Sequence, residues 1–246
     1  MIPYIPQPYL DVAGFRLYAF GGMVALAILT GLVVFRARMI RRGEPSSRVL
    51  VYCAAVVGFG LILSHTLKDL AFAADGSSGL LDVSRSIWSF GGLAGGTVAS
   101  LVFFWAAGVK GEKRWLYLDS TAIAFTTAWI FGRGGCSLAH DHIGRASQSI
   151  FAVAFPEGPR FELGMIEAVF TIFFAALLHY LDRRPRMPGF FWALFLVVYG
   201  PFRLWLDTLR ETPVPQDQAF ALLAFAAGTW FFASQWGARV QQEVRC

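Results

Sequence analysis

The chain has 246 residues, of which 56% are hydrophobic and only 15% are charged. Because a water-soluble domain usually carries about 25% charged residues, this composition excludes an ordinary soluble protein and predicts an integral membrane protein. The net charge of +5 is compatible with nucleic-acid binding, but the basic residues gather in short loops between apolar segments, as in polytopic membrane proteins. We therefore expect no nucleic-acid partner.

Seven stretches are apolar and long enough to cross a membrane, which requires roughly 20 residues. We expect these spans at about residues 14–35, 49–67, 87–109, 115–133, 162–181, 189–207 and 218–236. The sequence shows no internal repeat, so residues 1–246 are expected to form one membrane domain. The predicted fold class is an all-α integral membrane protein with seven transmembrane helices.

The basic residues predict the orientation of these spans. Thirteen of the 21 fall on one side, after the first, third and fifth spans and in the C-terminal tail: Arg36, Arg38, Arg41, Arg42, Arg48, Lys110, Lys113, Arg114, Arg183, Arg184, Arg186, Arg239 and Arg245. Cytoplasmic loops of membrane proteins carry an excess of such residues. The N-terminus is therefore expected outside the cell and the C-terminus in the cytoplasm, which agrees with an odd number of spans.

A charged segment, FGRGGCSLAHDHIGR, follows the fourth span at residues 131–145. A guanidinium next to a membrane span is costly unless it is paired, hydrated or bound to an anion. Arg133 is thus a candidate anion ligand, and the simpler alternative is that it reaches toward lipid headgroups. Gly132 and its neighbours allow close backbone approach or early unwinding of the helix. The charged residues that follow favour a functional site: His140, Asp141 and His142.

The remaining eight basic residues lie at or near the outer ends of spans, against the usual charge bias: Arg16, Lys68, Arg85, Arg133, Arg145, Arg160, Arg203 and Arg210. A binding site for an anionic lipid headgroup is one reason for such a distribution. Ordinary ion pairs with nearby acids are the other.

Five motifs, spread over most of the chain, resemble those of a known family. Residues 132–145 are similar to the signature GRxGNFINxExxGR, residues 160–167 (RFELGMIE) to RHPSQLYE, and residues 199–211 (YGPFRLWLDTLRE) to YGxFRFxxExxRE. Residues 15–23 (FRLYAFGGM) resemble a first-span tyrosine motif, and residues 88–95 (WSFGGLAG) resemble SFHGGLIG. These motifs are typical of the phosphatidylglycerol–prolipoprotein diacylglyceryl transferases, a seven-span family of the bacterial inner membrane.

The resemblance implies that a diacylglyceryl group passes from phosphatidylglycerol, or another anionic phospholipid, to the cysteine thiol of a lipoprotein precursor with a lipobox. It implies no cofactor. Arg133 and Arg203 would bind the lipid phosphate, because glycerol 1-phosphate leaves and arginine binds phosphate oxygens in pairs. The other aligned residues would bind the phospholipid (Arg145, Arg160, Arg210, Tyr18, Gly132 and Gly144) or orient the arginines (Asp119, Glu167 and Asp207).

The sequence also departs from the family. Phe90 replaces a histidine, Cys136 and Ala139 replace the signature asparagines, and Asp141 replaces a glutamate. If the chain is a transferase, a substitute base must activate the acceptor thiol. The candidates are His65, His140 and His142, and we favour His142 because Asp141 is its neighbour.

Three alternatives to this assignment remain. His140 and His142 form a metal pair only on a shared face, and the sequence shows no third ligand, so we expect no metal. A family member that has lost catalysis and binds only phospholipid or a partner protein is the main rival function. A small transporter ranks below it, because transporters usually contain an inverted repeat.

Overall fold

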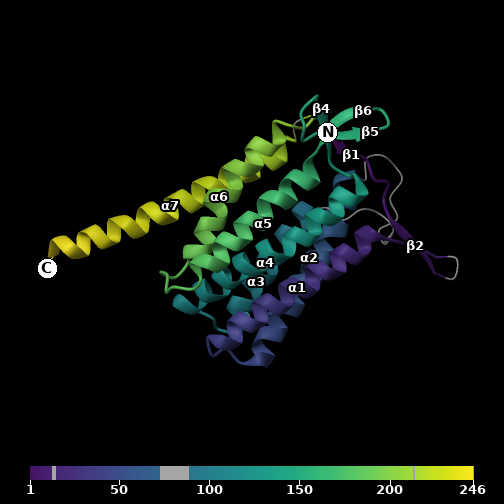
Figure 1. The fold of residues 1–246 in the computed structure, drawn as a ribbon. Helices are drawn as coiled ribbons and strands as arrows, with labels where there is room; N and C mark the ends of the chain where they lie inside the picture. The colour runs from purple at the N-terminus through teal and green to yellow at the C-terminus, as the bar shows by residue number, and fades with distance from the viewer. Residues whose placement is uncertain (13–14, 73–88, 213, 246) are drawn as a thin grey trace. The chain divides into compact units, whose positions relative to one another are not determined.

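The computed structural model describes residues 1–12, 15–72, 89–212 and 214–245, and these residues are mostly helical (Figure 1). The helices are α1 (Ala19–Arg41), α2 (Ser46–Phe72), α3 (Ser89–Ala106), α4 (Glu112–Ala139), α5 (Leu163–Leu181), α6 (Phe190–Asp207) and α7 (Pro215–Arg245). Each overlaps one predicted span, which confirms the helical class. Among the described residues, four helical segments are long and apolar enough to cross a membrane: α1, residues 46–66 of α2, α5 and α6.

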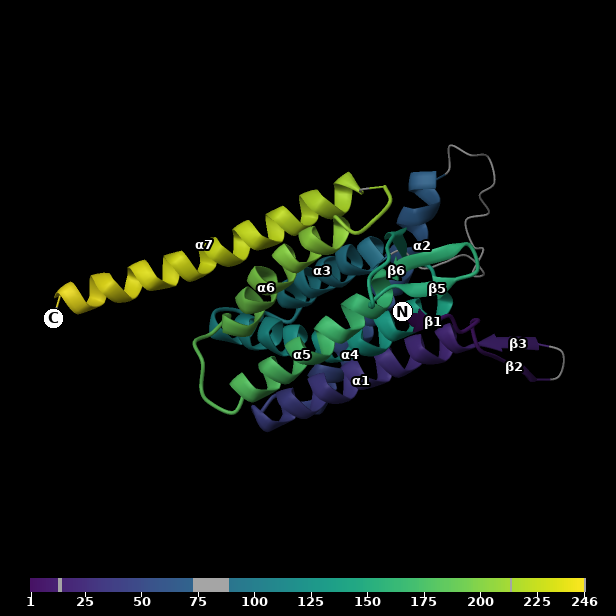
Figure 2. The same ribbon diagram turned by 45° about the horizontal axis from the view of Figure 1, so that its top comes forward.

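Short strands, which the sequence did not predict, accompany the helices. A four-stranded sheet has the order β1 (Ile2–Pro3), β5 (Val153–Phe155), β6 (Gly158–Glu162), β4 (Ile143–Ala146), and β2 (Tyr9–Val12) pairs with β3 (Phe15–Tyr18) in a hairpin. β1 runs parallel to β5, whereas β5–β6 and β6–β4 are antiparallel. Figure 2 shows the N-terminus beside β5 and β6. The sheet therefore connects the start of the chain to the segment between α4 and α5.

The chain divides into two compact units, residues 36–117 and the rest of the chain, Met1–Phe35 with Leu118–Cys246. In the larger unit, buried apolar side chains of α4, α5 and α6 form a core: Ala122, Ile123, Phe174, Leu178 and Phe191. The helices α6 and α7 run side by side in both views (Figures 1 and 2). A Cβ on Gly200 would lie 2.8 Å from the carbonyl oxygen of Ala221, so glycine permits this close approach.

In the smaller unit, two glycines of the WSFGGLAG motif bring α3 against α2. A Cβ on Gly91 would lie 2.5 Å from the Leu63 carbonyl oxygen, and one on Gly95 would lie 2.3 Å from that of Phe59. Because these glycines are four residues apart on one helical face, they form the small-residue stripe that lets membrane helices pack closely. This part of the motif therefore has a packing role.

Glu44, in the loop between α1 and α2, has a buried side chain in the same unit. Lys113 Nζ lies 2.8 Å from its carboxylate, and the Tyr117 hydroxyl donates to it at 3.1 Å. Burial raises the pKa of Glu44, but the hydrogen bonds from Lys113 and Tyr117 outweigh this effect, so the pKa is lowered overall. The carboxylate thus joins this loop to the start of α4.

Two helices have boundaries that differ from those of the predicted spans. α1 begins at Ala19, because Phe15–Tyr18 pairs as a strand, and it continues to Arg41, so that Arg36, Arg38 and Arg41 lie on the helix rather than in a loop. The glycines around Arg133 do not unwind α4, which continues to Ala139. A Cβ on Gly134 would lie 2.9 Å from Met23 Cε. These glycines therefore let α4 pack against α1.

Candidate functional site

The carboxylate of Glu167, on α5, is the centre of a buried charge cluster. Its Oε2 lies 3.0 Å from Arg133 Nε and 3.1 Å from Arg203 Nη1. Its Oε1 accepts hydrogen bonds from the Tyr199 hydroxyl at 2.5 Å and from Trp129 Nε1 at 3.0 Å. Two helices, α4 and α6, thus supply four donors to one carboxylate on α5. Glu167 therefore contacts both arginines through one carboxylate.

The cluster continues from α6 to the start of α7. Arg203 Nη2 donates to Asp217 Oδ2 at 2.6 Å, and Arg210 Nη2 lies 3.4 Å from the same oxygen. Arg210 Nε lies 2.9 Å from Asp207 Oδ1. Acids and arginines therefore alternate along a chain of contacts. Arg133, Arg203 and Arg210 each have a carboxylate partner in this cluster.

Arg133 extends the cluster toward the end of α4. Its guanidinium carbon lies 4.5 Å from the centre of the Trp129 ring, a cation–π contact, and its Nη1 donates to the Cys136 sulfur at 3.9 Å. Only 3% of the Arg133 residue is exposed. The guanidinium is thus fixed by aromatic, carboxylate and sulfur contacts at once.

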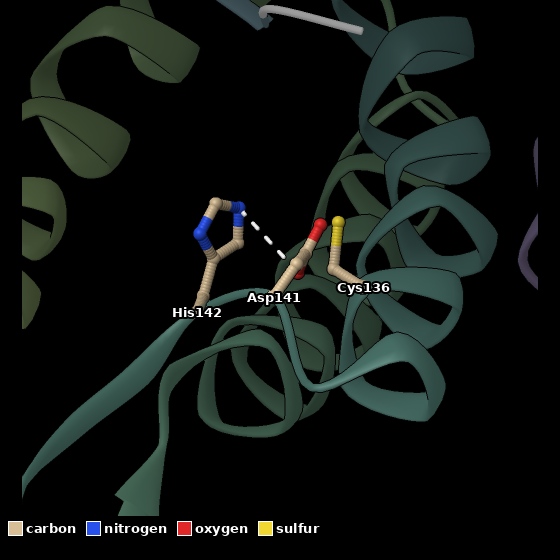
Figure 3. Close-up of side chains that lie close together, drawn as sticks. All are labelled: Cys136, Asp141 and His142. Carbon is tan, nitrogen blue, oxygen red and sulfur yellow. Dashed lines mark ion pairs between the residues drawn. The ribbon is translucent and has the colours of Figure 1, made fainter. Parts of the chain in front are cut away.

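Cys136, Asp141 and His142 lie together just beyond Arg133. Their ligand-type atoms all lie within 4.8 Å of one another, and His142 Nε2 is 3.8 Å from Asp141 Oδ1. Figure 3 shows the three side chains converging, with the dashed line marking the contact between His142 and Asp141. The pKa of His142 is lowered to about 4, first by burial and then by the charge of Arg133, with Asp141 acting in the opposite direction. At neutral pH its imidazole is therefore uncharged.

Both ring nitrogens of His140 have partners of their own, which indicates a structural role. Its Nε2 lies 2.8 Å from the Ile5 carbonyl oxygen, its Nδ1 lies 2.9 Å from Glu162 Oε2, and its ring faces that of Tyr4 at 4.8 Å. Burial raises the pKa of Glu162, against the effect of His140. His140 also adopts a left-handed φ of 54°, which non-glycine residues rarely do. It holds the N-terminal segment, so the histidine pair considered from the sequence does not form.

The loop that carries Asp141 and His142 is held by β4 and β6. A Cβ on Gly144 would lie 2.6 Å from the Leu209 carbonyl oxygen, so only glycine fits there. Arg160 Nε donates to the Gly144 carbonyl oxygen at 3.0 Å, and its Nη2 pairs with Glu211. Gly144 and Arg160 therefore position the loop. The exposed side chain of Arg145 makes no hydrogen bond or ion pair with the described part of the chain.

Two other predicted site residues have different roles. Asp119 accepts hydrogen bonds from the backbone N–H groups of Gly189 and Trp192, both at 2.9 Å, and so caps the N-terminus of α6. Arg203 lies eleven residues beyond Trp192 on that helix, about 16 Å along its axis, so Asp119 does not orient it. Tyr18, on the β2–β3 hairpin, is 48% exposed and faces the ring of Tyr9.

The remaining candidates lie on helices or outside the described residues. His65 is half-buried on α2, in the unit of residues 36–117. Gly132 lies within α4, one turn from Trp129. The side chain of Phe90, where the family has histidine, falls outside the residues whose side chains the structure describes.

Sequence reasoning missed four residues of the cluster: Trp129, Tyr199, Asp217 and Gln218. Gln218 donates to Asp207 Oδ2 at 2.6 Å. Asp217 lies in the first turn of α7, where acids are common because they favour the helix N-terminus. Tyr199 stands in the YGPFR motif itself. A signal was thus present for these two residues, but the contact of Asp217 with Arg203 and that of Tyr199 with Glu167 could be seen only in the fold.

Comparison with known proteins gives a consistent result. A family model described as prolipoprotein diacylglyceryl transferase matches residues 8–234. Three relatives named phosphatidylglycerol–prolipoprotein diacylglyceryl transferase are similar to the chain. The one from Clostridium tetani is 24% identical over 82% of this chain and 84% of its own length. The one from Frankia alni is 26% identical over 92% of this chain and 63% of its own length. The one from Mannheimia succiniciproducens is 33% identical over 49% of this chain and 46% of its own length.

The family match extends over most of the chain and includes every helix that contributes to the charge cluster. We conclude that this chain belongs to the prolipoprotein diacylglyceryl transferase family.

Proposed function

We propose that this chain transfers a diacylglyceryl group from phosphatidylglycerol, or another anionic phospholipid, to the cysteine thiol of a lipoprotein precursor. The observation that carries this proposal is the position of Asp217 Oδ2, which lies 2.6 Å from Arg203 Nη2 and 3.4 Å from Arg210 Nη2. A carboxylate oxygen there occupies the place of a phosphate oxygen between two guanidinium groups.

Lipid binding would replace this contact. Because the Asp217 side chain is 22% exposed, it is the most accessible acid of the cluster and the one that a phosphodiester can displace. Glu167 would hold Arg133 and Arg203 throughout, since its carboxylate is only 1% exposed. The arginines would then stabilise the charge that develops on the phosphate oxygen as it leaves.

The acceptor thiol would approach from the side of Asp141 and His142. The thiol loses its proton, and the sulfur forms a bond to the glycerol carbon that carries the phosphate. The carbon–oxygen bond breaks, and its electron pair leaves with the glycerol phosphate. Of the three candidate histidines, His142 is supported by its contact with Asp141 and its place beside Cys136, whereas His140 is committed to Ile5 and Glu162.

We further propose that all seven helices span the bacterial inner membrane as one membrane domain, with the N-terminus in the periplasm. The seven helices and the basic residues at the ends of α1, α4 and α5 support this arrangement. The test is labelling of the native Cys246 in intact cells with a thiol reagent that does not cross the membrane. Labelling from the periplasm would contradict the proposed topology.

The function is tested with purified protein, phosphatidylglycerol labelled in its acyl chains, and a lipobox peptide. Label should pass to the cysteine peptide, not to a peptide with serine in its place, and glycerol phosphate should appear in equal amount. Arg203→Ala should abolish transfer, while Arg184→Ala, in the exposed loop after α5, serves as the matched control.

The same experiment separates the second candidate, a family member that binds lipid without catalysis. The replacement of the family histidine by Phe90 is the observation that favours it. Arg203-dependent binding of phosphatidylglycerol vesicles, without transfer, would support this candidate. Binding equal to that of neutral phosphatidylcholine vesicles would exclude both.

A further inference from the structure

We propose that Cys136, Asp141 and His142 bind one divalent metal ion of the zinc class. The sulfur, the carboxylate oxygen and the imidazole nitrogen are the three ligand types that zinc prefers in proteins. They come from two neighbouring segments, the last turn of α4 and the residues just before β4. From the sequence, a metal pair of His140 and His142 had no third ligand. In the fold, His142 instead lies beside Cys136 and Asp141.

The distances suit such an ion after a small movement. The ligand atoms lie within 4.8 Å of one another, and His142 Nε2 and Asp141 Oδ1 are 3.8 Å apart. Zinc bonds of about 2.0–2.3 Å in a tetrahedron place ligand atoms roughly 3.3–3.8 Å apart. The widest pair therefore has to close by about 1 Å, which side-chain rotation supplies.

The backbone already holds these ligands near one another. The carbonyl oxygen of His142 accepts from the Leu163 N–H at 3.0 Å, which ties the loop to the start of α5. A Cβ on Gly164 would lie 3.2 Å from Cys136 Cβ, so α5 also packs directly on the cysteine. An ion would thus meet ligands that are largely in place, which lowers the cost of ordering them.

The local charge also favours a cation. The three arginines of the cluster are matched by Glu167, Asp207 and Asp217, so Asp141 adds a negative charge that they do not balance. Arg133 Nη1 lies 3.9 Å from the Cys136 sulfur and opposes a dication, but its charge is shared with Glu167 at 3.0 Å.

Three protein ligands leave one position of a tetrahedral ion open, as in catalytic zinc sites. This part rests on the proposed function: the open position takes the sulfur of the acceptor cysteine, whose proton passes to solvent because a coordinated thiol is deprotonated. The bound sulfur then attacks the glycerol carbon as above. His142 acts here as a ligand, and coordination replaces the base that Phe90 cannot provide.

The test starts from purified protein treated with a chelator. One equivalent of Zn²⁺ is added and the metal retained per chain is measured, while Co²⁺ in a parallel sample reports sulfur coordination by its near-ultraviolet charge-transfer absorption. We expect one ion per chain. Cys136→Asn restores the residue of the family signature, so it should fold, and it should weaken Zn²⁺ binding by more than about 100-fold, since even outer-shell changes cost about 10–100-fold.

Two variants complete the design. His142→Asn should weaken Zn²⁺ binding similarly, and Cys53→Ala, which removes the other described thiol, on α2, should leave it unchanged. Less than stoichiometric retention, or retention unaffected by Cys136→Asn and His142→Asn, would overturn the site. If the protein binds the metal but still transfers the lipid after the metal is removed by a chelator, the proposed activation of the thiol by the metal would be overturned. Bound metal that depends on Cys136, with no transfer in any metal state, would instead count against the proposed function.

Discussion

Arg133 Nε and Arg203 Nη1 lie 3.0 and 3.1 Å from the same carboxylate oxygen, Oε2 of Glu167. Two guanidinium groups of like charge are thus held close together by one buried carboxylate. The arrangement is stable only while that acid is charged, because a buried guanidinium without a partner is strongly unfavourable. Glu167 therefore has two effects at once: it stabilises the fold, and it fixes the two arginines proposed to act on the lipid phosphate.

Replacing Glu167 by glutamine should destabilise the protein by about 3–5 kcal/mol, since it leaves buried charges uncompensated. The measurement is thermal unfolding in detergent. The matched control is Glu211→Gln, which removes a carboxylate that is 70% exposed and pairs with Arg160. An exposed pair contributes about 0–1 kcal/mol. Equal destabilisation by the two variants would contradict the central role of Glu167.

Asp217→Asn should strengthen binding of phosphatidylglycerol vesicles by about 1 kcal/mol, because a competing carboxylate of a partly exposed pair is removed. Arg203→Ala should weaken it by about 1.5–3 kcal/mol, and Arg203→Lys should restore only part, because lysine lacks the planar fork. Binding is measured by vesicle co-sedimentation. Weaker binding in Asp217→Asn would show that Asp217 positions the arginines rather than competing with lipid.

Sequence patterns predicted the helices and part of the site, and different physical signals lay behind the two predictions. Long apolar segments predicted all seven helices, and the aligned motifs predicted that Arg133, Glu167 and Arg203 act together. The strands, of two to five residues, were missed because so few residues give little periodic pattern, and β1 also pairs with the distant β5. Asp217 and Cys136 were missed because the role of each depends on neighbours that only the fold brings close.

The free energy of unfolding should fall in acid because of Glu44. Burial acts to raise the pKa of this carboxyl group, but the contacts with Lys113 and Tyr117 outweigh burial and lower it overall. A carboxyl group with a depressed pKa stabilises the fold above its unfolded value of 4.5 and loses this contribution as the pH falls through the folded value. Glu44→Gln should lower the free energy of unfolding by about 1–3 kcal/mol at pH 7, and it should reduce the loss of stability in acid. Unfolding is measured at pH 7 and in the acid range. Glu112→Gln, exposed in the first turn of α4, is the control and should change neither.

Gly144→Ala should both destabilise the protein and lower transfer, because the new Cβ would lie 2.6 Å from the Leu209 carbonyl oxygen and displace the loop that carries Asp141 and His142. Overpacking of this kind costs about 1–3 kcal/mol. Gly22→Ala, on α1, has nothing within 4 Å of the new Cβ and should be neutral or slightly stabilising. Unfolding and transfer assays on both variants check this, and wild-type behaviour of Gly144→Ala would show that the loop can shift freely.

The histidine lost at Phe90 allows a direct test of whether a substitute evolved. His142→Gln should lower the transfer rate, because it removes a group that activates the acceptor thiol, as a base or as a metal ligand. The loss of a general base typically costs about 10²–10⁴-fold. His65→Gln should transfer at the wild-type rate. His140→Gln should act mainly through stability, because it releases Ile5 and Glu162. Thermal unfolding measured beside transfer separates these two effects.

The complementary variant restores the family histidine. Phe90→His placed in the His142→Gln background should recover part of the rate, because the resemblance to the family implies that a histidine at that position can take a proton. In the wild-type background the gain should be small, because thiol activation is already supplied. A large gain there, together with three glutamine variants that all match the wild type, would mean that none of these histidines substitutes for the lost one. The chain would then be a lipid-binding member of the family without transferase activity of its own.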